Sequence, residues 1–228
     1  MRISVIIPCF NEKNTIEKII NKIISQKDLN IEIIVIDDFS TDGTRDILKG
    51  EIRKKITKIL FNESNNGKGY CVKRGIESAT GNVILIQDAD LEYDPKEYSK
   101  LIKPIVEEHA DVVYGSRFIG SEERRILFFW HTVANKLLTL LSNMFTNLNL
   151  TDMETCYKVF KREIIENIDL KEKRFGFDPE ITAKIAKLKP RIYEVGISYF
   201  GRTYDQGKKI GIKDAFIVLK CIFIYNLF

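Results

Sequence analysis

The stretch ISVIIPCFNE, residues 3–12, decides the fold, because a β-branched apolar run ends there in a proline and polar residues. Ile3–Ile7 is typical of a buried strand. Isoleucines then recur at helical spacing over Thr15–Ile24, and Glu32–Ile36 is a second apolar run. A strand, a helix and a second strand in this order predict a parallel pair joined by a crossover helix.

The same alternation continues through the first half of the chain. Further strands are predicted at Thr57–Phe61, Asn82–Ile86 and Asp111–Tyr114, and helices at Thr41–Leu48, Gly69–Ser78 and Pro95–Val106. This pattern predicts an α/β, Rossmann-like and mostly parallel sheet with helices on both faces. Such sheets bind ligands beyond the carboxyl ends of their strands. The loops expected there are Pro8–Glu12, Asp37–Thr44, Asn62–Lys68 and Gln87–Asp94.

The second half is less regular. Helices are predicted at Ile126–Phe145, Glu163–Ile168, Pro179–Leu188 and Ile212–Asn226, and a strand at Arg191–Tyr199. Since neither a linker nor an internal repeat is present, we expect residues 1–228 to form one domain. Residues 1–120 would be its nucleotide-sugar and metal half, and residues 121–228 its acceptor half.

Composition excludes several classes of protein. The 228 residues are 44% hydrophobic, which excludes disorder, and the net charge of +4 is too small to indicate a nucleic-acid binder. The charge is uneven, however, because residues 169–228 carry 12 basic and 7 acidic residues. The excess positive charge therefore lies beside an apolar tail.

The cysteines and histidines argue against a zinc site or a disulfide framework. Four cysteines lack a C-x-x-C pair and there are two histidines. We expect buried thiols in a reducing cytosol. The N-terminus does not read as a signal peptide, and no run approaches the ~20 uncharged apolar residues of a membrane span.

The strongest local signal is Asp88-Ala89-Asp90, directly after the apolar run Val83–Ile86. Two carboxylates at a strand end suit Mg²⁺ or Mn²⁺, which often shares such ligands with a diphosphate. Glu92 is a candidate third ligand or an orienting group. The alternative is a polar turn without metal.

Other polar residues also follow the predicted strands. Asp37 could accept hydrogen bonds from a base or ribose, whereas Asp42-Gly43 is typical of a helix cap. Gly67 and Gly69 would let the backbone approach a ligand while Lys68 contacts phosphate. Neither G-x-G-x-x-G after the first strand nor G-x-x-x-x-G-K-[ST] is present.

Basic residues in later glycine-containing loops are candidate phosphate ligands. Arg117 follows the Asp111–Tyr114 strand, and Arg202, Lys208 and Lys209 lie near Gly201 and Gly207. Solvated surface cations are the alternative for the lysines.

Taken together, these motifs resemble family 2 glycosyltransferases of the GT-A fold. The resemblance is greatest to the polyprenyl-phosphate type, of which dolichyl-phosphate mannosyltransferase is the named example. It rests on Ile6–Glu12, Val35–Thr44, Asn66–Gly69, Asp88–Asp90 and Gly115–Arg117, and extends less specifically to Asp152–Arg162, Phe175–Ile185 and Tyr199–Gly211.

The resemblance implies roles for individual residues on the donor side. Pro8, Asn11 and Glu12 would line the base and ribose of the nucleotide, and Asp37 would hold the base. Lys68 and Asp88 are grouped with these nucleotide-binding residues.

It implies further roles around the donor diphosphate. Asp88 and Asp90 would hold Mg²⁺ or Mn²⁺ there, with Glu92 near the metal where the dolichyl type commonly has Gln. Arg202 and Lys209 would close over the diphosphate.

On the acceptor side, Arg117 would meet the acceptor phosphate. Asp90, Arg117, Arg202 and Lys209 would thus form the catalytic set. Cys156 replaces the glycine usual in the dolichyl type.

The implied reaction is inverting transfer of a sugar from a UDP- or GDP-linked donor to a polyprenyl phosphate, at the cytoplasmic face of the cell membrane. The alternative acceptor is a sugar or other hydroxyl in cell-surface polysaccharide or glycan synthesis, with Asp152 as base. The apolar helices predicted at 126–145 and 212–226 suit the bilayer interface, flanked by Lys208, Lys209, Lys213 and Lys220. Burial in the core or a homo-oligomer interface is the alternative for these helices.

Overall fold

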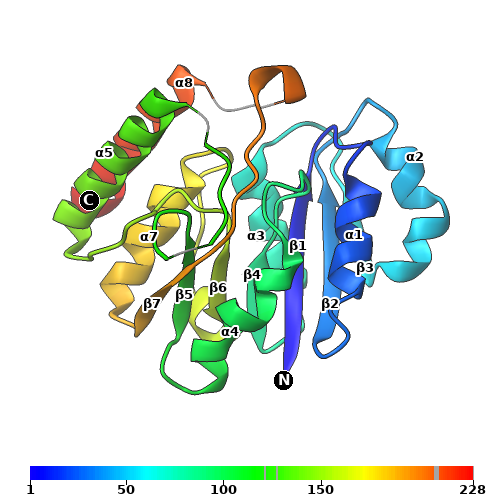
Figure 1. Ribbon diagram of the computed structural model, residues 1–228, viewed down its shortest axis with the longest axis horizontal. Coiled ribbons are helices and arrows are strands. Elements are labelled where there is room, and N and C mark those ends of the chain that lie inside the picture. The colour runs from blue at the N-terminus through cyan, green and yellow to red at the C-terminus, as the bar shows by residue number, and fades with distance from the viewer. Residues whose placement is uncertain (121, 127, 208–210, 228) are drawn as a thin grey trace.

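The computed structural model describes residues 1–120, 122–126, 128–207 and 211–227, and a mixed sheet lies at its centre (Figure 1). The strands run in the order β3-β2-β1-β4-β6-β5-β7. Their bounds are β1 (Arg2–Cys9), β2 (Asn30–Asp37), β3 (Lys58–Phe61), β4 (Val83–Ile86), β5 (Val112–Ser116), β6 (Lys158–Lys161) and β7 (Ile192–Gly196). Pairing is parallel except that β6 runs antiparallel to β4 and β5.

Helices cover both faces of this sheet, and α5 and α8 lie together at one edge beside α7 (Figure 1). Their bounds are α1 (Ile16–Ile24), α2 (Thr44–Lys49), α3 (Lys68–Ser78), α4 (Tyr98–Val106), α5 (Phe129–Thr146), α6 (Arg162–Ile165), α7 (Phe177–Leu188) and α8 (Ile212–Leu227). Short 3₁₀ turns are η1 (Glu51–Lys55), η2 (Pro95–Glu97) and η3 (Tyr204–Gln206). The predicted fold class, a mostly parallel α/β sheet, is confirmed.

Strand β6 is the element that sequence reasoning missed. Its four residues, K-V-F-K, form a short apolar pair with a lysine at each end, and no strand was predicted there. Lys158 is nevertheless fully buried, since its ammonium group forms an ion pair with Asp178 of α7. The pairing that allows this burial joins residues 20 positions apart, which no local pattern reveals.

Two predicted boundaries move for local reasons. Strand β7 ends at Gly196 rather than Tyr199, because Tyr199 forms an isolated bridge with Arg124 instead. Helix α2 begins at Thr44 after Gly43, whose φ of 99° favours glycine. The N-cap is thus Gly43 rather than Thr41 or Asp42, and it has no side chain to form a capping hydrogen bond. Asp42, one position earlier, accepts the Thr44 N–H at 3.0 Å.

The apolar strands carry the core. Side chains of β1, β2, β4 and β5 are almost entirely buried. The four cysteines are buried thiols, as predicted. Within the described ranges, the helices are too short or too polar to cross a membrane.

Candidate active site

The acid pair after β4 lies at the carboxyl end of the sheet, and each carboxylate is paired with a different cation. The Lys68 ammonium lies 2.8 Å from Asp88 Oδ1. The Arg202 guanidinium lies 2.8 Å from Asp90 Oδ2. Lys68 begins α3, whereas Arg202 comes from the segment after β7, so the site joins parts of the chain far apart in sequence.

The two carboxyl groups differ in proton affinity. Burial acts to raise the pKa of Asp88, but the charge and hydrogen bond of Lys68, together with the Cys156 thiol and the Lys158 charge, hold that pKa below its ordinary value. Burial, followed by the carboxylates of Asp88 and Glu92, raises the pKa of Asp90 to about 7. A bound cation would reduce the repulsion among these closely placed carboxylates.

The carboxylate oxygens of Asp88 and Asp90 suit Mg²⁺ or Mn²⁺ as part of a ligand set. Among the described residues, no three Asp, Glu, His or Cys side chains are grouped closely enough to hold a metal. Asp88 and Asp90 could therefore supply two ligands, and the rest would come from water or a bound diphosphate. Mg²⁺ is commonly held in proteins in this way.

Glu92, the candidate third metal ligand, instead contacts the segment 199–202. Its carboxylate accepts hydrogen bonds from the Arg202 backbone at 3.0 Å, the Arg202 Nε at 3.2 Å and the Tyr199 hydroxyl at 2.7 Å. Its backbone carbonyl accepts the Phe200 N–H at 2.9 Å. Glu92 thus anchors this segment over the acid pair.

The loops after β1 and β2 hold each other in place. The Asn11 N–H donates to Ser40 Oγ at 2.9 Å, and the Asn11 amide oxygen accepts the Thr41 N–H at 2.8 Å. The Glu12 N–H donates to Thr44 Oγ1. Asn11 and Glu12 therefore lie beside the end of β2, and Pro8 pairs with Ile36 within the parallel ladder.

Asp37 lies at the end of β2 with one oxygen occupied and one free. Arg45 Nε donates to Asp37 Oδ2 at 2.5 Å, and the Ser40 N–H donates to the same oxygen at 3.2 Å. Asp37 Oδ1 is buried and has no hydrogen-bond partner among the described residues. A buried acceptor left unpaired is costly, so this oxygen suits an N–H donor from a ligand.

Sequence reasoning assigned no role to Asp38, which organises the third loop. Its carboxylate accepts hydrogen bonds from the Asn62 amide at 2.7 Å and from the backbone N–H groups of Asn66 and Gly67 at 2.9 and 2.6 Å. The available signal in the sequence was the pair of consecutive acids, Asp37 and Asp38, at a strand end. One acid normally suffices for one ligand contact, so the second acid pointed to a separate role.

Gly67 and Gly69 are required by packing within the chain, whereas their approach to a ligand stays a prediction. A Cβ on Gly67 would lie 2.5 Å from the Lys173 carbonyl oxygen, and one on Gly69 would lie 2.3 Å from that of Glu172. The glycines therefore admit the chain before α7. This packing brings the start of α3, and with it Lys68, against the second half of the protein.

Arg117 is held by Asp152 in a two-pronged ion pair. Its Nε and Nη2 donate to the two Asp152 oxygens at 2.6 and 2.7 Å, and its backbone N–H donates at 3.0 Å. Asp152 is fully buried. The Arg117 guanidinium also stacks on Tyr199, 5.2 Å from the ring centre, which places it next to the segment anchored by Glu92.

A buried polar cluster lies beneath the acid loop and was not foreseen. The Gln87 amide oxygen accepts the hydroxyl groups of Tyr98 and Tyr157, each at 2.7 Å. The Gln87 amide nitrogen donates to the Asp88 and Tyr93 carbonyls at 2.9 and 3.4 Å. One side chain thereby joins both ends of the loop 88–93 to the core.

Glu154 is a second unforeseen group. Its Oε1 is buried without a hydrogen-bond partner in the described structure. Burial, and then the neighbouring Asp178 carboxylate, raise its pKa to about 8. Asp178 itself is paired with Lys158. The charges that act on Glu154 also include Arg117 and Asp152, so it lies near that ion pair.

The remaining predicted cations lie outside the described residues. Lys209, assigned to the catalytic set, and Lys208 belong to residues 208–210. Arg202 therefore represents the late basic segment in the described site.

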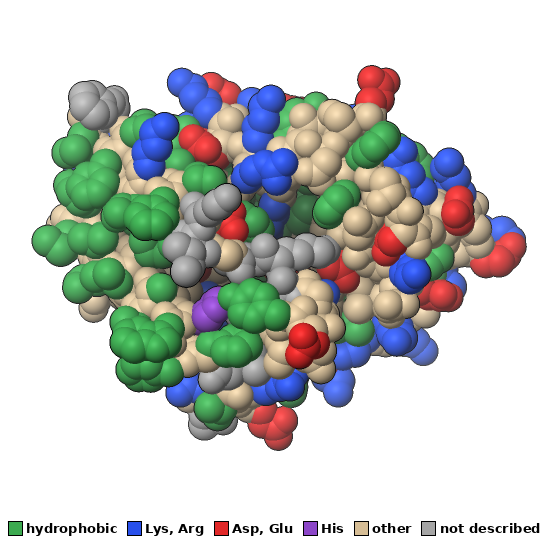
Figure 2. Space-filling view, turned by 90° about the horizontal axis from the view of Figure 1, so that it is seen from above, with side chains coloured by type: hydrophobic (Ala, Val, Ile, Leu, Met, Phe, Trp, Pro, Cys, Tyr) green, Lys and Arg blue, Asp and Glu red, His purple; other side chains and the backbone are tan. Residues whose placement is uncertain are grey.

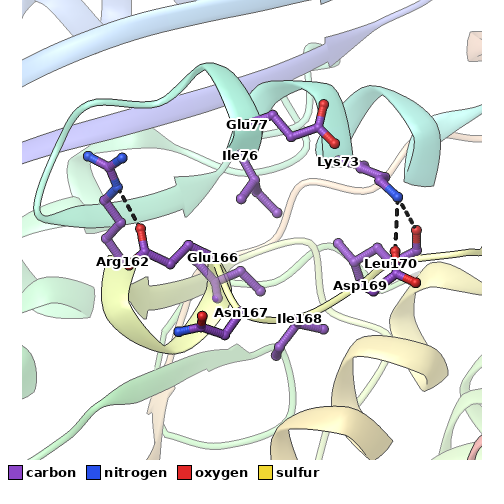
Figure 3. Close-up of a pocket in the computed structure, with 10 residues that line it drawn as sticks. Lys73, Ile76, Glu77, Arg162, Glu166, Asn167, Ile168, Asp169 and Leu170 are labelled. Atoms are coloured by element: carbon purple, nitrogen blue, oxygen red, sulfur yellow. Dashed lines mark hydrogen bonds and ion pairs between the residues drawn. The ribbon is translucent and has the colours of Figure 1, made fainter.

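A separate groove of about 380 Å³ lies between α3 and the segment 162–170 (Figure 3). Lys73 reaches across it to Asp169 and the Leu170 carbonyl, and Arg162 pairs with Glu166. Its polar groups thus contact one another, and we assign it no part in the site.

Comparison with known proteins supports this description. The chain is 27% identical over 215 residues to a dolichol-phosphate mannosyltransferase of Pyrococcus furiosus, covering 92% of this chain and 61% of that protein. It is 24% identical to an undecaprenyl-phosphate 4-deoxy-4-formamido-L-arabinose transferase of Aeromonas hydrophila, covering 90% and 62%. The chain thus spans about six-tenths of the length of these two relatives.

The fold also matches solved structures. Glucosyl-3-phosphoglycerate synthase of Mycobacterium tuberculosis, in complex with Mn²⁺, UDP and glucosyl-3-phosphoglycerate, superimposes with a TM-score of 0.76 at 19% identity, covering 98% of this chain and 79% of that one. The same enzyme with Mg²⁺ and UDP gives a TM-score of 0.73 at 20% identity, with coverage of 98% and 79%. The fold is therefore that of the GT-A glycosyltransferases.

Finally, the model of glycosyl transferase family 2 matches residues 4–169, which hold the acid pair and the loops around it. The chain belongs to glycosyl transferase family 2.

Proposed function

We propose that this protein transfers a sugar from a nucleotide-sugar to a polyprenyl phosphate at a membrane surface, with inversion and with Mg²⁺ or Mn²⁺. The relatives named above act on dolichol phosphate and undecaprenyl phosphate, and UDP with Mn²⁺ or Mg²⁺ is bound in the solved structures. For this chain, we infer a polyprenyl phosphate acceptor, a membrane surface and a divalent cation from these similarities.

The observation that carries the proposal is the short distance along the chain between acid site and apolar surface. Arg202 contacts Asp90, and Tyr204, two residues later, contacts the start of α5. The Tyr204 hydroxyl lies 2.9 Å from His131 Nε2, and its ring centre lies 5.5 Å from that of Phe128. A lipid phosphate at this junction would place its phosphate near the site and its chain along α5.

The surface of α5 and α8 suits such a chain. Figure 2 looks onto the face at the carboxyl ends of the parallel strands and shows hydrophobic side chains gathered over these two helices. Phe129, Trp130 and Met144 are each about 70% exposed, as is Phe216 of α8. Leu138 and Leu141 instead pack inward against Met153, Val218 and Ile222. One face of each helix is thus core-facing and the other is apolar and exposed, which favours a bilayer interface.

The chemistry follows from the charges. An acceptor phosphate is anionic at neutral pH, so its oxygen attacks the anomeric carbon as the bond to the nucleoside diphosphate breaks, and no strong base is needed. The metal, held by Asp88 and Asp90, would stabilise the departing diphosphate. Asp37 Oδ1 would accept a hydrogen bond from the base. Arg117 would position the acceptor phosphate with the guanidinium nitrogen that Asp152 leaves unused.

The hydroxyl-acceptor alternative receives less support. It needs a base, and the candidate Asp152 is buried with both oxygens paired to Arg117. Both oxygens of this carboxylate are therefore bound to Arg117 and are not left open to an acceptor hydroxyl.

A donor panel tests the proposal. UDP- and GDP-sugars are incubated with undecaprenyl or dolichyl phosphate, with and without Mn²⁺, and products are identified by mass spectrometry. We expect a lipid-linked sugar phosphate that requires the metal. Transfer to a soluble hydroxyl acceptor, with none to either lipid phosphate, would refute the assigned acceptor.

A further inference from the structure

Arg202 lies where three carboxylates from separate parts of the chain converge. Its Nη1 is 3.3 Å from Glu12, its Nη2 is 2.8 Å from Asp90, and its Nε is 3.2 Å from Glu92. The Arg202 side chain is only 18% exposed, so water screens these contacts weakly. This guanidinium is the cation that balances the acid cluster.

The contact with Asp90 leaves no oxygen of that carboxylate free. Asp90 Oδ2 accepts from Arg202 Nη2, and Asp90 Oδ1 accepts the Glu92 backbone N–H at 3.1 Å. The second bond is local and shapes the loop. A divalent cation that binds Asp90 Oδ2 therefore meets Arg202 as its competitor.

We propose that Arg202 is the counter-ion of Asp90 in the donor-free protein and that a divalent cation gains this carboxylate when Arg202 leaves it. The inference rests on the proposed function, because the anionic diphosphate of a nucleotide donor is what would receive the guanidinium. Cation and nucleotide then favour each other's binding by a route additional to their direct contact.

The structure also indicates which atoms move. The Glu92 carboxylate accepts the Arg202 N–H and the Tyr199 hydroxyl, and the Glu92 carbonyl accepts the Phe200 N–H. These bonds hold the backbone around Arg202. None of these bonds involves the end of the Arg202 side chain. The guanidinium can therefore exchange Asp90 for a diphosphate by side-chain rotation while the segment 199–202 stays in place.

Binding of Mn²⁺ alone tests the inference without any turnover. Free Mn²⁺ is measured by electron paramagnetic resonance during titration of the wild-type chain and of Arg202→Gln. We expect the variant to bind Mn²⁺ about tenfold more tightly in the absence of nucleotide, since a charged hydrogen bond no longer has to be broken. Its additional gain in affinity on adding UDP or GDP should be smaller than that of the wild type.

Two further variants separate charge and fold from competition. Arg202→Lys keeps a cation and should stay near wild-type affinity. Arg191→Gln removes an equally ion-paired arginine, 2.8 Å from Asp111 at the opposite end of the sheet, and should leave Mn²⁺ binding unchanged. Thermal unfolding of each variant identifies any loss of fold.

The outcomes distinguish the inference from the function on which it rests. Equal or weaker Mn²⁺ binding by folded Arg202→Gln, with nucleotide-dependent binding retained, would overturn the counter-ion role and leave the proposed transfer intact. Absence of Mn²⁺ binding in every variant, with UDP and with GDP, would overturn both.

Discussion

The strand-end site and the outer face of α5 and α8 satisfy their side chains in opposite ways. At the site, Asp88, Asp90, Glu92 and Arg117 each have a protein partner of opposite charge. On the helices, Trp130 and Phe216 are 75% and 68% exposed. A ligand must therefore exchange partners at the site, whereas a ligand of the helices adds to a surface that no described residue covers.

This difference sets what each region can discriminate. Exchange of ion pairs is selective, because every new contact is weighed against one that is lost. Apolar burial is tolerant of shape and scales with the area covered. We expect the donor to be chosen strictly and the lipid loosely.

The strongest test of the ion-paired site at the strand ends is Asp90→Ala. Sugar transfer should fall at least about a hundredfold, because a metal held with the help of Asp90 would supply several kcal/mol of charge stabilisation to the leaving group. Asp94→Asn is the matched control, since Asp94 is ion-paired with Lys22 on the surface at 2.7 Å. Initial rates measured with one donor and undecaprenyl phosphate compare the two. Undiminished transfer by Asp90→Ala would remove the acid pair from the mechanism.

The strongest test of the apolar face of α5 and α8 combines Trp130→Ser with Phe216→Ser. Binding to liposomes that contain anionic lipid should weaken by more than about tenfold, because two large apolar side chains no longer enter the interface. Val106→Ser with Leu188→Ser removes side chains that are 55% and 52% exposed on α4 and α7, and should leave binding unchanged. Liposome co-sedimentation measures both. Equal loss in the two double variants would show that the α5–α8 face has no special role.

The buried cluster under the acid loop allows a test of stability. Gln87→Leu should lower the free energy of unfolding by about 2 kcal/mol or more, because the Tyr98 and Tyr157 hydroxyls lose their shared acceptor. Tyr98→Phe, which removes one donor, should cost less. Urea denaturation followed by circular dichroism gives both values. A Gln87→Leu protein as stable as the wild type would mean that water replaces the missing oxygen.

The smallest expected effect concerns Glu154 and pH. Its pKa of about 8 lies above the ordinary value of 4.5, so the folded state keeps a proton that the unfolded state loses between these values. The stability from this group is fully present below pH 4.5 and is lost as pH rises through 8. The melting temperature of Glu154→Gln should therefore fall less between pH 5 and pH 8.5 than that of the wild type.

Glu51→Gln provides the control for this titration, because Glu51 is a solvent-exposed carboxylate whose side chain is 92% exposed. It should follow the wild-type curve across the whole pH range. A Glu154→Gln protein that also follows this curve would contradict the raised pKa.

Sequence reasoning succeeded where information is local. The strands of the first half and the loops after them were predicted because apolar runs end directly in polar residues, as at Ile86 and Asp88. It did not predict the environment of residues whose partners lie far away in the sequence. Lys158 is buried because of Asp178, and Arg117 is immobilised by Asp152, 35 positions later.

The role of Glu92 shows the same limit within the site. Its position two residues after Asp90 predicted a third metal ligand or an orienting group. The hydrogen bonds that it accepts from residues 199–202, more than 100 positions away, could not be read from that spacing. The helix over residues 126–145 was predicted from its apolar spacing, but which of its leucines face outward was not. Leu137 and Leu140 are exposed, whereas Leu138 and Leu141 pack inward.

The burial of Cys9, Cys71, Cys156 and Cys221 has a practical consequence. Burial also raises the pKa of Cys71, Cys156 and Cys221, so these thiols react slowly with alkylating reagents. A cysteine introduced at the exposed Tyr204 would be labelled selectively in the native protein. A fluorophore there would report donor and lipid binding from the junction of the two regions, without removal of any native cysteine.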